Sequence, residues 1–200
     1  MTEARQVRQS LLGRVRTGLA GRSTRQAAAH ALYLRLVAQA RDPFLFRVLG
    51  VPDTREGRLE SVLLHAMLVM RRLRREGEPG RRLAQALFDL MFADIDRHMR
   101  EWGVGDLSVG KRVKAVAQSF YAQAGAAEPA LAAGDAATLA PILARNVYEA
   151  APLDASGAAD LAAYLIDQAA WLDGMPGAAL LAGEATFRPA ASPAPWPVAD

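Results

Sequence analysis

The segment from Gly105 to Lys111 reads Gly-Asp-Leu-Ser-Val-Gly-Lys, which matches the start of a phosphate-binding loop. Such a loop needs Ser or Thr at the following position to hold Mg²⁺, and it follows a buried strand. Here the following residue is Arg112, and a helical pattern precedes the segment. We therefore expect no nucleotide site. We interpret Gly103 as a helix cap, Gly105 as a turn residue and Gly110 as a point of close helix approach.

Metal or acid–base chemistry has few candidates. Asp94 and His98 are four residues apart and would share one helix face, where they could bind a metal ion together. His30 and His65 are the other histidines, and the chain has no cysteine. The repeated Glu and Glu-x-x-His pairs of a di-iron bundle are missing, and Ser108 has no recognisable His–Asp partners. We expect no metal, no cofactor and no enzymatic activity, with His65 as a hydrogen-bonded residue of the core or of a groove.

Charge is distributed unevenly along the 200 residues. Residues 1–100 carry 19 basic and 10 acidic residues, whereas residues 101–200 carry 5 basic and 11 acidic residues. Eight Arg and no Asp or Glu occur between Ala4 and Arg41. This basic stretch could face lipid headgroups or ribosomal RNA, or the two halves could neutralise each other in the fold. The longest apolar stretch, Val62–Met70, is interrupted by His65 and is too short to span a bilayer.

The abundance of Ala, Leu, Arg and Gln favours an all-α fold. Apolar residues recur at helical spacing in a series of segments, and we find no strand pattern. We expect a single helical domain of about six to eight helices with long central antiparallel helices. The expected segments are 5–16, 24–40, 54–76, 81–102, 108–124, 136–150, 156–172 and 178–181, with a break at 18–23, loops at 44–54 and 77–80, and an extended tail from Pro189.

The junction between the predicted helices 81–102 and 108–124 carries charges of both signs. A helix that follows a short glycine turn is formally similar to a DNA-reading helix. The preceding helices are too long for such a module, however, and the acidic residues would repel phosphate, so we expect no DNA partner. Two interpretations stay open, a protein-contact surface of mixed charge and a solvated face held by internal ion pairs.

The same junction resembles a known family. Its residues Leu87-Phe88-Asp89, Met91-Phe92-Ala93-Asp94, Asp96-Arg97, Arg100-Glu101, Gly103–Lys114 and Phe120-Tyr121 look like the pattern of the ubiquinol–cytochrome c chaperone family. The resemblance covers roughly residues 30–172 and is most specific at 83–121.

The resemblance implies an all-α assembly factor for respiratory complex III. Mitochondrial members of the family bind newly made cytochrome b near the membrane and the ribosomal exit, together with a small helical partner. Carried onto this chain, the pattern makes eight charged residues candidates for partner contact: Asp89, Asp94, Arg97, Arg100, Glu101, Lys111, Arg112 and Lys114. Met67, Met70, Met91 and Met99 could line an adaptable groove, although core packing suits about three of the four better.

We accordingly divide the chain into a basic N-terminal helix (1–25), a helical chaperone domain (26–185) and a Pro/Ala-rich flexible tail (186–200). We predict a chaperone of the bacterial cytoplasm, peripheral to the inner membrane, or of the matrix side in a eukaryote. Its partners would be cytochrome b, a small helical co-chaperone, and an anionic membrane or the ribosome. The alternatives are a peripheral adaptor that binds anionic lipid and an enzyme with a metal near His65 or His98.

Overall fold

The structure is a computed structural model that describes residues 3–101, 105–148 and 155–189, with the side chains of these residues described from residue 21 onward except at 106–107 and 155–156. Eight helices occur in these residues: α1 (Glu3–Ala40), α2 (Pro43–Arg47), α3 (Arg55–Arg74), α4 (Gly77–Glu101), α5 (Asp106–Ala133), α6 (Ala136–Val147), α7 (Ala155–Asp173) and α8 (Gly177–Leu181). The described residues contain no strand, which confirms the all-α prediction.

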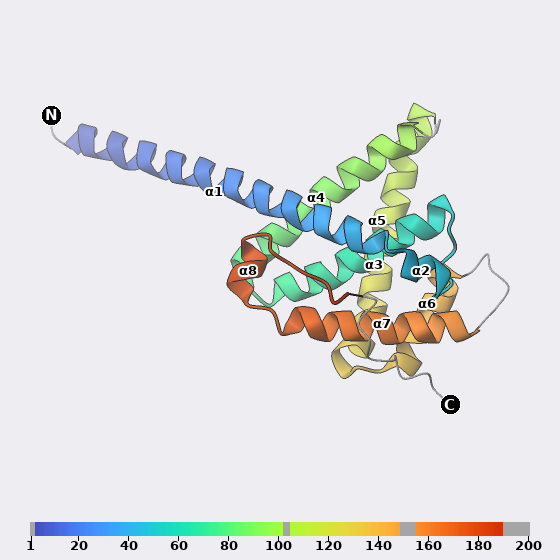
Figure 1. The fold of residues 1–200 in the computed structure, drawn as a ribbon. Coiled ribbons are helices and arrows are strands. Elements are labelled where there is room, and N and C mark those ends of the chain that lie inside the picture. Colours follow the sequence, from blue (N-terminus) through green and yellow to red (C-terminus); the bar gives the residue numbers. More distant parts are fainter. Residues whose placement is uncertain (1–2, 102–104, 149–154, 190–200) are drawn as a thin grey trace.

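Helix α3 lies at the centre of the molecule, and α1, α4 and α7 pack around it, while the N-terminal part of α1 extends away from the body (Figure 1). Its N-cap is Thr54, whose side chain accepts a hydrogen bond from the backbone N–H of Gly57. Every residue from Leu63 to Leu73 is buried. A helix that is buried on all sides must be surrounded by others, as the long apolar face predicted.

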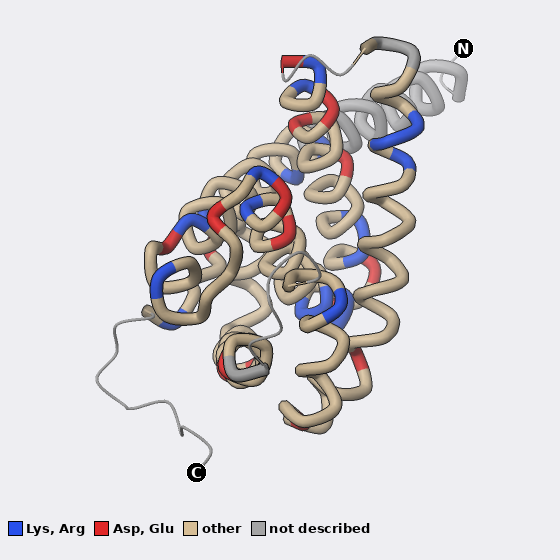
Figure 2. Tube along the Cα trace, turned by 90° about the vertical axis from the view of Figure 1, so that its right-hand side faces the viewer, with Lys and Arg blue, Asp and Glu red and all other residues tan. Residues whose placement is uncertain are grey.

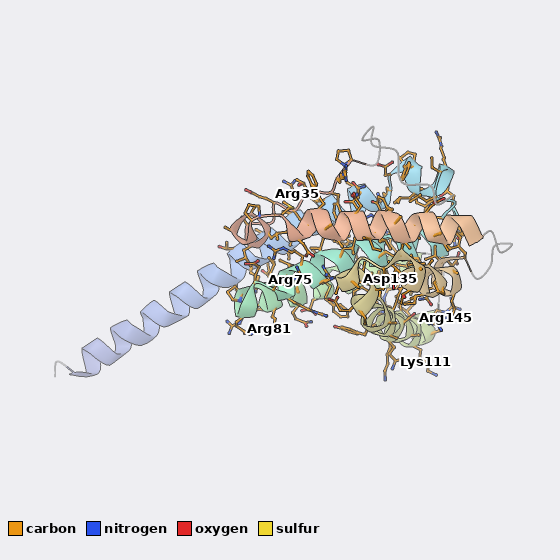
Figure 3. The ribbon with its side chains drawn as sticks, turned by 90° about the horizontal axis from the view of Figure 1, so that it is seen from below. Arg35, Arg75, Arg81, Lys111, Asp135 and Arg145 are labelled. Atoms are coloured by element: carbon orange, nitrogen blue, oxygen red, sulfur yellow. The ribbon has the colours of Figure 1, made fainter. Side chains whose placement is uncertain are left out.

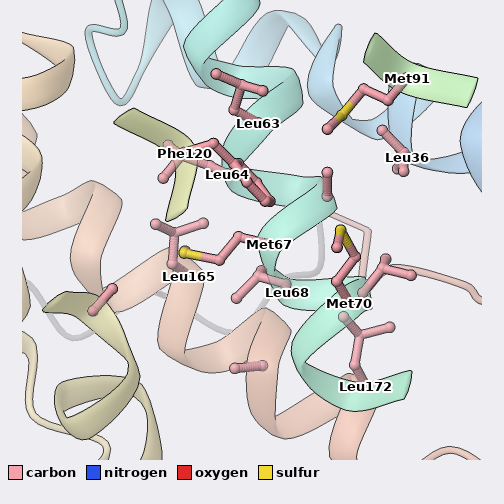
Figure 4. Packing of buried hydrophobic residues seen from close by; sticks show 14 of the residues in the cluster. Leu36, Leu63, Leu64, Met67, Leu68, Met70, Met91, Phe120, Leu165 and Leu172 are labelled. Atoms are coloured by element: carbon pink, nitrogen blue, oxygen red, sulfur yellow. The ribbon is translucent and has the colours of Figure 1, made fainter. Parts of the chain in front are cut away.

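Methionine and leucine side chains fill the interface between α3 and its neighbours (Figure 4). Met67, Met70 and Met91 are at most 5% exposed and belong to the core. Met99 is also buried, but it borders a surface groove between α3, α4 and α5. The expectation that most of these methionines serve packing is confirmed.

Two helix boundaries differ from the prediction because glycine or proline was given too much weight. The break expected at residues 18–23 is wrong, since α1 is one helix from Glu3 to Ala40. The space around the Cβ position of Gly21 is open, so this glycine lowers helix stability without preventing the helix. The turn expected at 77–80 is the first turn of α4, where Pro79 lacks only an N–H that would have no intrahelical acceptor.

Helix α5 continues nine residues past the predicted end at Ala124, to Ala133. Pro129 removes one backbone donor, but Pro129 and Gly125 are both exposed, so water can satisfy the freed carbonyl. The helix ends at Gly134, which adopts the left-handed conformation with φ 68° and donates its N–H to the carbonyl of Ala130.

The predicted loop at 44–54 contains the short helix α2. The carboxylate of Asp42 accepts the N–H of Phe44 and starts this helix at Pro43. Leu45 is fully buried, and Phe44 and Phe46 pack against the core.

Two arginines near the end of α3 are buried and join this helix to α5 and α7. Arg71 donates to Asp173 of α7 and to Glu128 of α5. Arg72 donates to the backbone carbonyls of Leu172 and Met175. These cations therefore do more than complement the negative end of the α3 dipole.

The last described residues pack along α7. Gln168 of α7 makes two hydrogen bonds with the backbone of Arg188, and the side chain of Arg188 forms an ion pair with Asp167. The predicted Pro/Ala-rich tail lies, from residue 190 onward, outside the described residues.

Candidate partner-binding surface

Helices α4 and α5 run antiparallel, side by side, so the junction between them stands at one end of the molecule (Figure 1). Four aromatic rings join the two helices. Phe88 stacks on Tyr121 with 5.2 Å between ring centroids, and Phe92 meets Phe120 edge-on at 6.3 Å. Tyr121 is 47% exposed, so one face of this aromatic cluster reaches the surface.

Asp94 ties α4 to α1 rather than facing solvent. Its carboxylate accepts a hydrogen bond of 2.6 Å from the hydroxyl of Tyr33, and it forms ion pairs with Arg97 and with His98, three and four residues further along α4. Burial and the neighbouring Asp94 carboxylate raise the pKa of Tyr33, so the phenol keeps its proton and remains a donor. Asp94 and His98 are thus joined to each other on α4, and Asp94 also contacts Tyr33 of α1.

Several other charged residues of α4 are paired along their own helix. Arg100 donates to Asp96 at 2.8 Å, and Asp89 accepts from Gln85 at 2.7 Å. Glu101 is exposed at the end of α4. Figure 2 shows acidic and basic residues interspersed along these helices. The interpretation as a solvated face with internal ion pairs therefore describes much of α4.

The basic residues at the start of α5 are different. Lys111, Arg112 and Lys114 are exposed, and no ion pair in the described part of the chain involves them. Figure 3 shows Lys111 pointing away from the body. They lie in the first turns of α5, where the positive end of the helix dipole adds to their charge. This turn of α5 presents three cations to solvent.

The start of α5 differs from the sequence prediction at Gly110. The hydroxyl of Ser108 donates to the carbonyl of Gly105 and does not accept from a free N–H group, and the residue at the N-cap is Gly105. Gly110 makes no close helix contact, because a Cβ there would meet no atom within 4 Å. Residue Gly103 and the side chain of Asp106 lie outside the described part of the structure.

Three surface grooves separate the predicted contact residues. Asp89 lies in a groove of about 660 Å³ between α1 and α4, with Arg22, Arg25 and Arg82. The second groove, of about 500 Å³, lies between α1, α3 and α4, and its lining includes Tyr33, Arg41, Arg58, Asp94 and His98 over Val37, Leu59, Val62 and Ile95. The third groove, of about 370 Å³, contains Arg112. Three of the eight predicted contact residues, Asp89, Asp94 and Arg112, therefore lie in three different grooves.

The third groove contains a residue that the sequence analysis missed. Glu60 of α3 is largely buried, and its Oε2 atom has no hydrogen-bond partner in the described structure. Burial raises the pKa of Glu60 to about 7. The sequence could have indicated that Glu60 is buried. Leu63 and Leu64 follow it by three and four residues on the same helical face, and both are core residues.

His65 is a fully buried structural residue, as predicted. Its Nδ1 lies 2.7 Å from the carbonyl of Ser61, which fixes Nδ1 as the donor. Its Nε2 accepts from the hydroxyl of Tyr164 at 2.8 Å, and that oxygen accepts from Gln39. The ring of Phe187 covers the imidazole edge-on at 5.3 Å. Burial lowers the pKa of His65 to about 4, so the imidazole is neutral at pH 7.

No group of three or more His, Cys, Asp or Glu side chains able to hold a metal ion occurs in the part of the chain with described side chains. Among the described helices, none combines the length and the apolar character that crossing a bilayer requires.

The profile of a known protein family, the ubiquinol–cytochrome c chaperones, matches residues 47–187 of this chain. The chain belongs to this family. The match includes α3 to α8, and therefore the α4–α5 junction and the groove that contains Glu60. Family membership confirms the resemblance found in the sequence of the junction.

Individual relatives agree with this assignment. Ubiquinol–cytochrome c reductase complex assembly factor 1 of Mus musculus is 26% identical over 163 residues, which are 81% of this chain and 55% of the mouse protein. This chain thus spans about half the length of the mouse relative and of the human one. The Xenopus laevis factor is 24% identical, with 81% of each chain covered. The crystal structure of the Cbp3 homolog from Brucella abortus is similar with a TM-score of 0.78 and 34% identity, over 90% of this chain and 97% of that chain.

Proposed function

We propose that this protein is a non-enzymatic chaperone that binds newly made or unassembled cytochrome b during assembly of the ubiquinol–cytochrome c reductase complex. The observation that carries the proposal is the family match over residues 47–187. The relatives from mouse, human and frog are named as assembly factors of that complex.

The geometry is suited to binding another protein. The interior is closed by apolar packing and by the buried ion pairs of Arg71, so the helical frame holds its surface in a fixed arrangement. Surface grooves with apolar floors, such as Leu59, Val62 and Ile95 between α3 and α4, can take apolar side chains of a client. The exposed cations Lys111, Arg112 and Lys114 and the ring of Tyr121 supply polar and aromatic contacts nearby on α5.

The basic N-terminal stretch supports a position at an anionic surface. The eight arginines between Ala4 and Arg41 have no acidic neighbours in that stretch. Arg22 and Arg25 line the groove between α1 and α4 together with Arg82. We place the protein at the cytoplasmic face of a bacterial inner membrane, or at the matrix face in a eukaryote, where a small helical co-chaperone or the ribosome could also bind.

The test is crosslinking in the native host followed by affinity purification of the tagged protein. The expected result is enrichment of cytochrome b, together with loss of assembled complex III when the gene is deleted. Normal levels of complex III in the deletion strain, with no cytochrome b in the crosslinked material, would contradict the proposal.

A second candidate function is an adaptor that binds anionic lipid without a dedicated client, and the arginine-rich stretch favours it. Sedimentation with vesicles of anionic lipid, compared with neutral vesicles, separates the two. If the protein is only such an adaptor, the crosslinked and purified material should contain lipid or ribosomes but no cytochrome b. Vesicle binding that survives deletion of residues 1–25 would show that the first helix does not provide the lipid contact.

A further inference from the structure

Glu60 lacks the partner that a buried carboxyl group ordinarily has. No hydrogen bond or ion pair joins it to another described residue, and its Oε2 is shielded from solvent within the chain. Buried polar groups in folded proteins are nearly always paired, because an unpaired one has lost its hydration without compensation. A carboxyl group in this state is retained against a stability cost, which points to a partner outside the chain.

The groove around Glu60 has apolar walls from three helices. Leu59 from α3, Met99 from α4, and Ala115 and Val116 from α5 line it. Leu59 also lines the larger groove beside Val62 and Ile95, so the two grooves adjoin and share an apolar floor. Apolar walls of this kind suit the aliphatic stem of a long cationic side chain, with its charged end at the carboxylate.

The charges that line the groove come from α3 and α5. Glu56 lies one turn before Glu60 on the same face of α3, so two carboxyl groups follow the groove. Arg55 of α3 and Arg112 of α5 are the cations of the described lining. From α4 the lining includes only Met99, and His98 lines the adjoining groove.

We propose that this groove binds a lysine or arginine side chain of the client protein, with Glu60 as its acceptor and Leu59, Met99 and Val116 as the contacts of its stem. The inference rests on the proposed function, because it names the chemistry that the chaperone recognises. Membrane proteins carry an excess of Lys and Arg directly beside their apolar segments on the cytoplasmic side. In an unassembled membrane protein, the apolar floor of the groove would contact the end of such a segment, and the buried carboxylate of Glu60 would bind the neighbouring Lys or Arg.

The test uses the full chain and two labelled peptides in a fluorescence anisotropy titration. Both peptides are helical sequences of Leu and Ala, one with a single central lysine and one with norleucine in its place. The protein should bind the lysine peptide about tenfold more tightly at pH 8, as a charge-assisted hydrogen bond in a sheltered site would give. Because Glu60 holds its proton up to about pH 7, this preference should decline at pH 6.

Three variants make the result specific. Glu60→Gln keeps the shape and removes the charge, and it should abolish the preference for the lysine peptide. Glu60→Asp keeps the charge and should retain part of the preference. Glu184→Gln, at an exposed glutamate outside this groove, should retain all of it. Equal binding of both peptides by the wild type, or an unchanged preference in Glu60→Gln, would overturn the proposal.

Failure of this inference can be told apart from failure of the proposed function. Cytochrome b that crosslinks equally to the wild type and to Glu60→Gln would overturn the role of Glu60 and leave the chaperone proposal standing. A selective lysine site in a protein that never captures cytochrome b would overturn the client and leave the cation site standing.

Discussion

The hydroxyl of Tyr164 on α7 donates a hydrogen bond of 2.8 Å to Nε2 of His65 on α3, in the interior of the molecule. The pair joins residues that are 99 positions apart in the chain, and Gln39 of α1 donates to the same hydroxyl oxygen. Three helices therefore meet through one polar contact. Each group has the partner it needs, which makes this buried polar cluster stabilising as a whole.

Removal of the Tyr164 hydroxyl should lower stability. In Tyr164→Phe the Nε2 atom of buried His65 loses its donor, and the amide of Gln39 loses its acceptor. We expect a loss of about 1–3 kcal/mol in the free energy of unfolding, measured by urea denaturation. Tyr121→Phe, at an exposed ring on α5, is the matched control and should change stability little. Equal stability of Tyr164→Phe and the wild type would contradict the hydrogen-bond assignment.

Two buried groups should give opposite dependences of stability on pH. Burial lowers the pKa of His65 to about 4, so the unfolded chain binds the proton first and stability falls as the pH drops from 6.5 to 4. Burial raises the pKa of Glu60 to about 7, so the folded chain holds its proton and stability falls as the pH rises from 4.5 to 7.

The two trends oppose each other between about pH 4.5 and 6.5. We expect the contributions of His65 and Glu60 largely to cancel in the wild type over this range. Glu60→Gln should reveal a stability that increases with pH, measured as urea midpoints at several pH values. An identical pH profile for the variant and the wild type would exclude a raised pKa at Glu60.

The buried cation Arg71 should make its partner Asp173 important for stability. Asp173→Asn leaves a guanidinium that is 6% exposed with Glu128 as its remaining carboxylate. Breaking a buried ion pair in this way should cost about 3 kcal/mol. The control is Glu78→Gln, which removes exposed pairs with Arg81 and Arg82 on α4 and should have no measurable effect on the melting temperature. Similar losses in the two variants would show that burial of Arg71 is unimportant.

Two glycines should respond to alanine in opposite ways. A Cβ at Gly80 would lie 1.9 Å from the carbonyl oxygen of Leu73, so Gly80→Ala must push α4 away from α3 and destabilise the protein. A Cβ at Gly110 would meet nothing within 4 Å, so Gly110→Ala should stabilise α5 by about 0.5–1 kcal/mol through helix propensity. Thermal melts followed by circular dichroism measure both. A gain at Gly80 or a large loss at Gly110 would contradict the packing described for each.

Charge reversal should distinguish a contact surface from a structural one at the α4–α5 junction. Lys111, Arg112 and Lys114 are exposed and have no ion-pair partners within the described structure, so changing all three to Glu should preserve the melting temperature within a few degrees. The same variant should lose crosslinking to the client by tenfold or more. Unchanged client binding would return this turn of α5 to a purely structural role. Asp94→Asn, by contrast, should lower the melting temperature, because it weakens the contact with Tyr33.

Apolar residues that recur at helical spacing over many turns were sufficient to predict α3 and α4. A segment with so many core positions leaves little doubt that it is a helix. The errors cluster where a single residue was interpreted in isolation. Gly21, Pro79 and Pro129 each weaken a helix locally, but their neighbours are strong helix formers and the affected backbone groups are exposed or lie at a helix end. Whether a glycine or a proline ends a helix therefore depends on its neighbours and on the exposure of the affected backbone groups.

The candidate surface was predictable only in part. The family pattern located the junction. It could not show that Asp94 accepts a hydrogen bond from Tyr33, because that contact joins residues 61 positions apart in the chain. Glu60 was overlooked for a related reason. A glutamate at the edge of an apolar helix is ordinarily solvated, and only the packing of α4 and α5 over α3 removes its water.

The ring of Phe187 packs edge-on against His65. We expect this contact to form late during synthesis of the chain. The polar cluster of α3 and α7 is near the middle of the fold, but the residue that covers it is among the last in the described chain. A growing chain can form α1 to α6 and dock them while His65 is still open to water. We therefore expect His65 to lose its contact with water only after residues 185–188 have been synthesised and lie along α7.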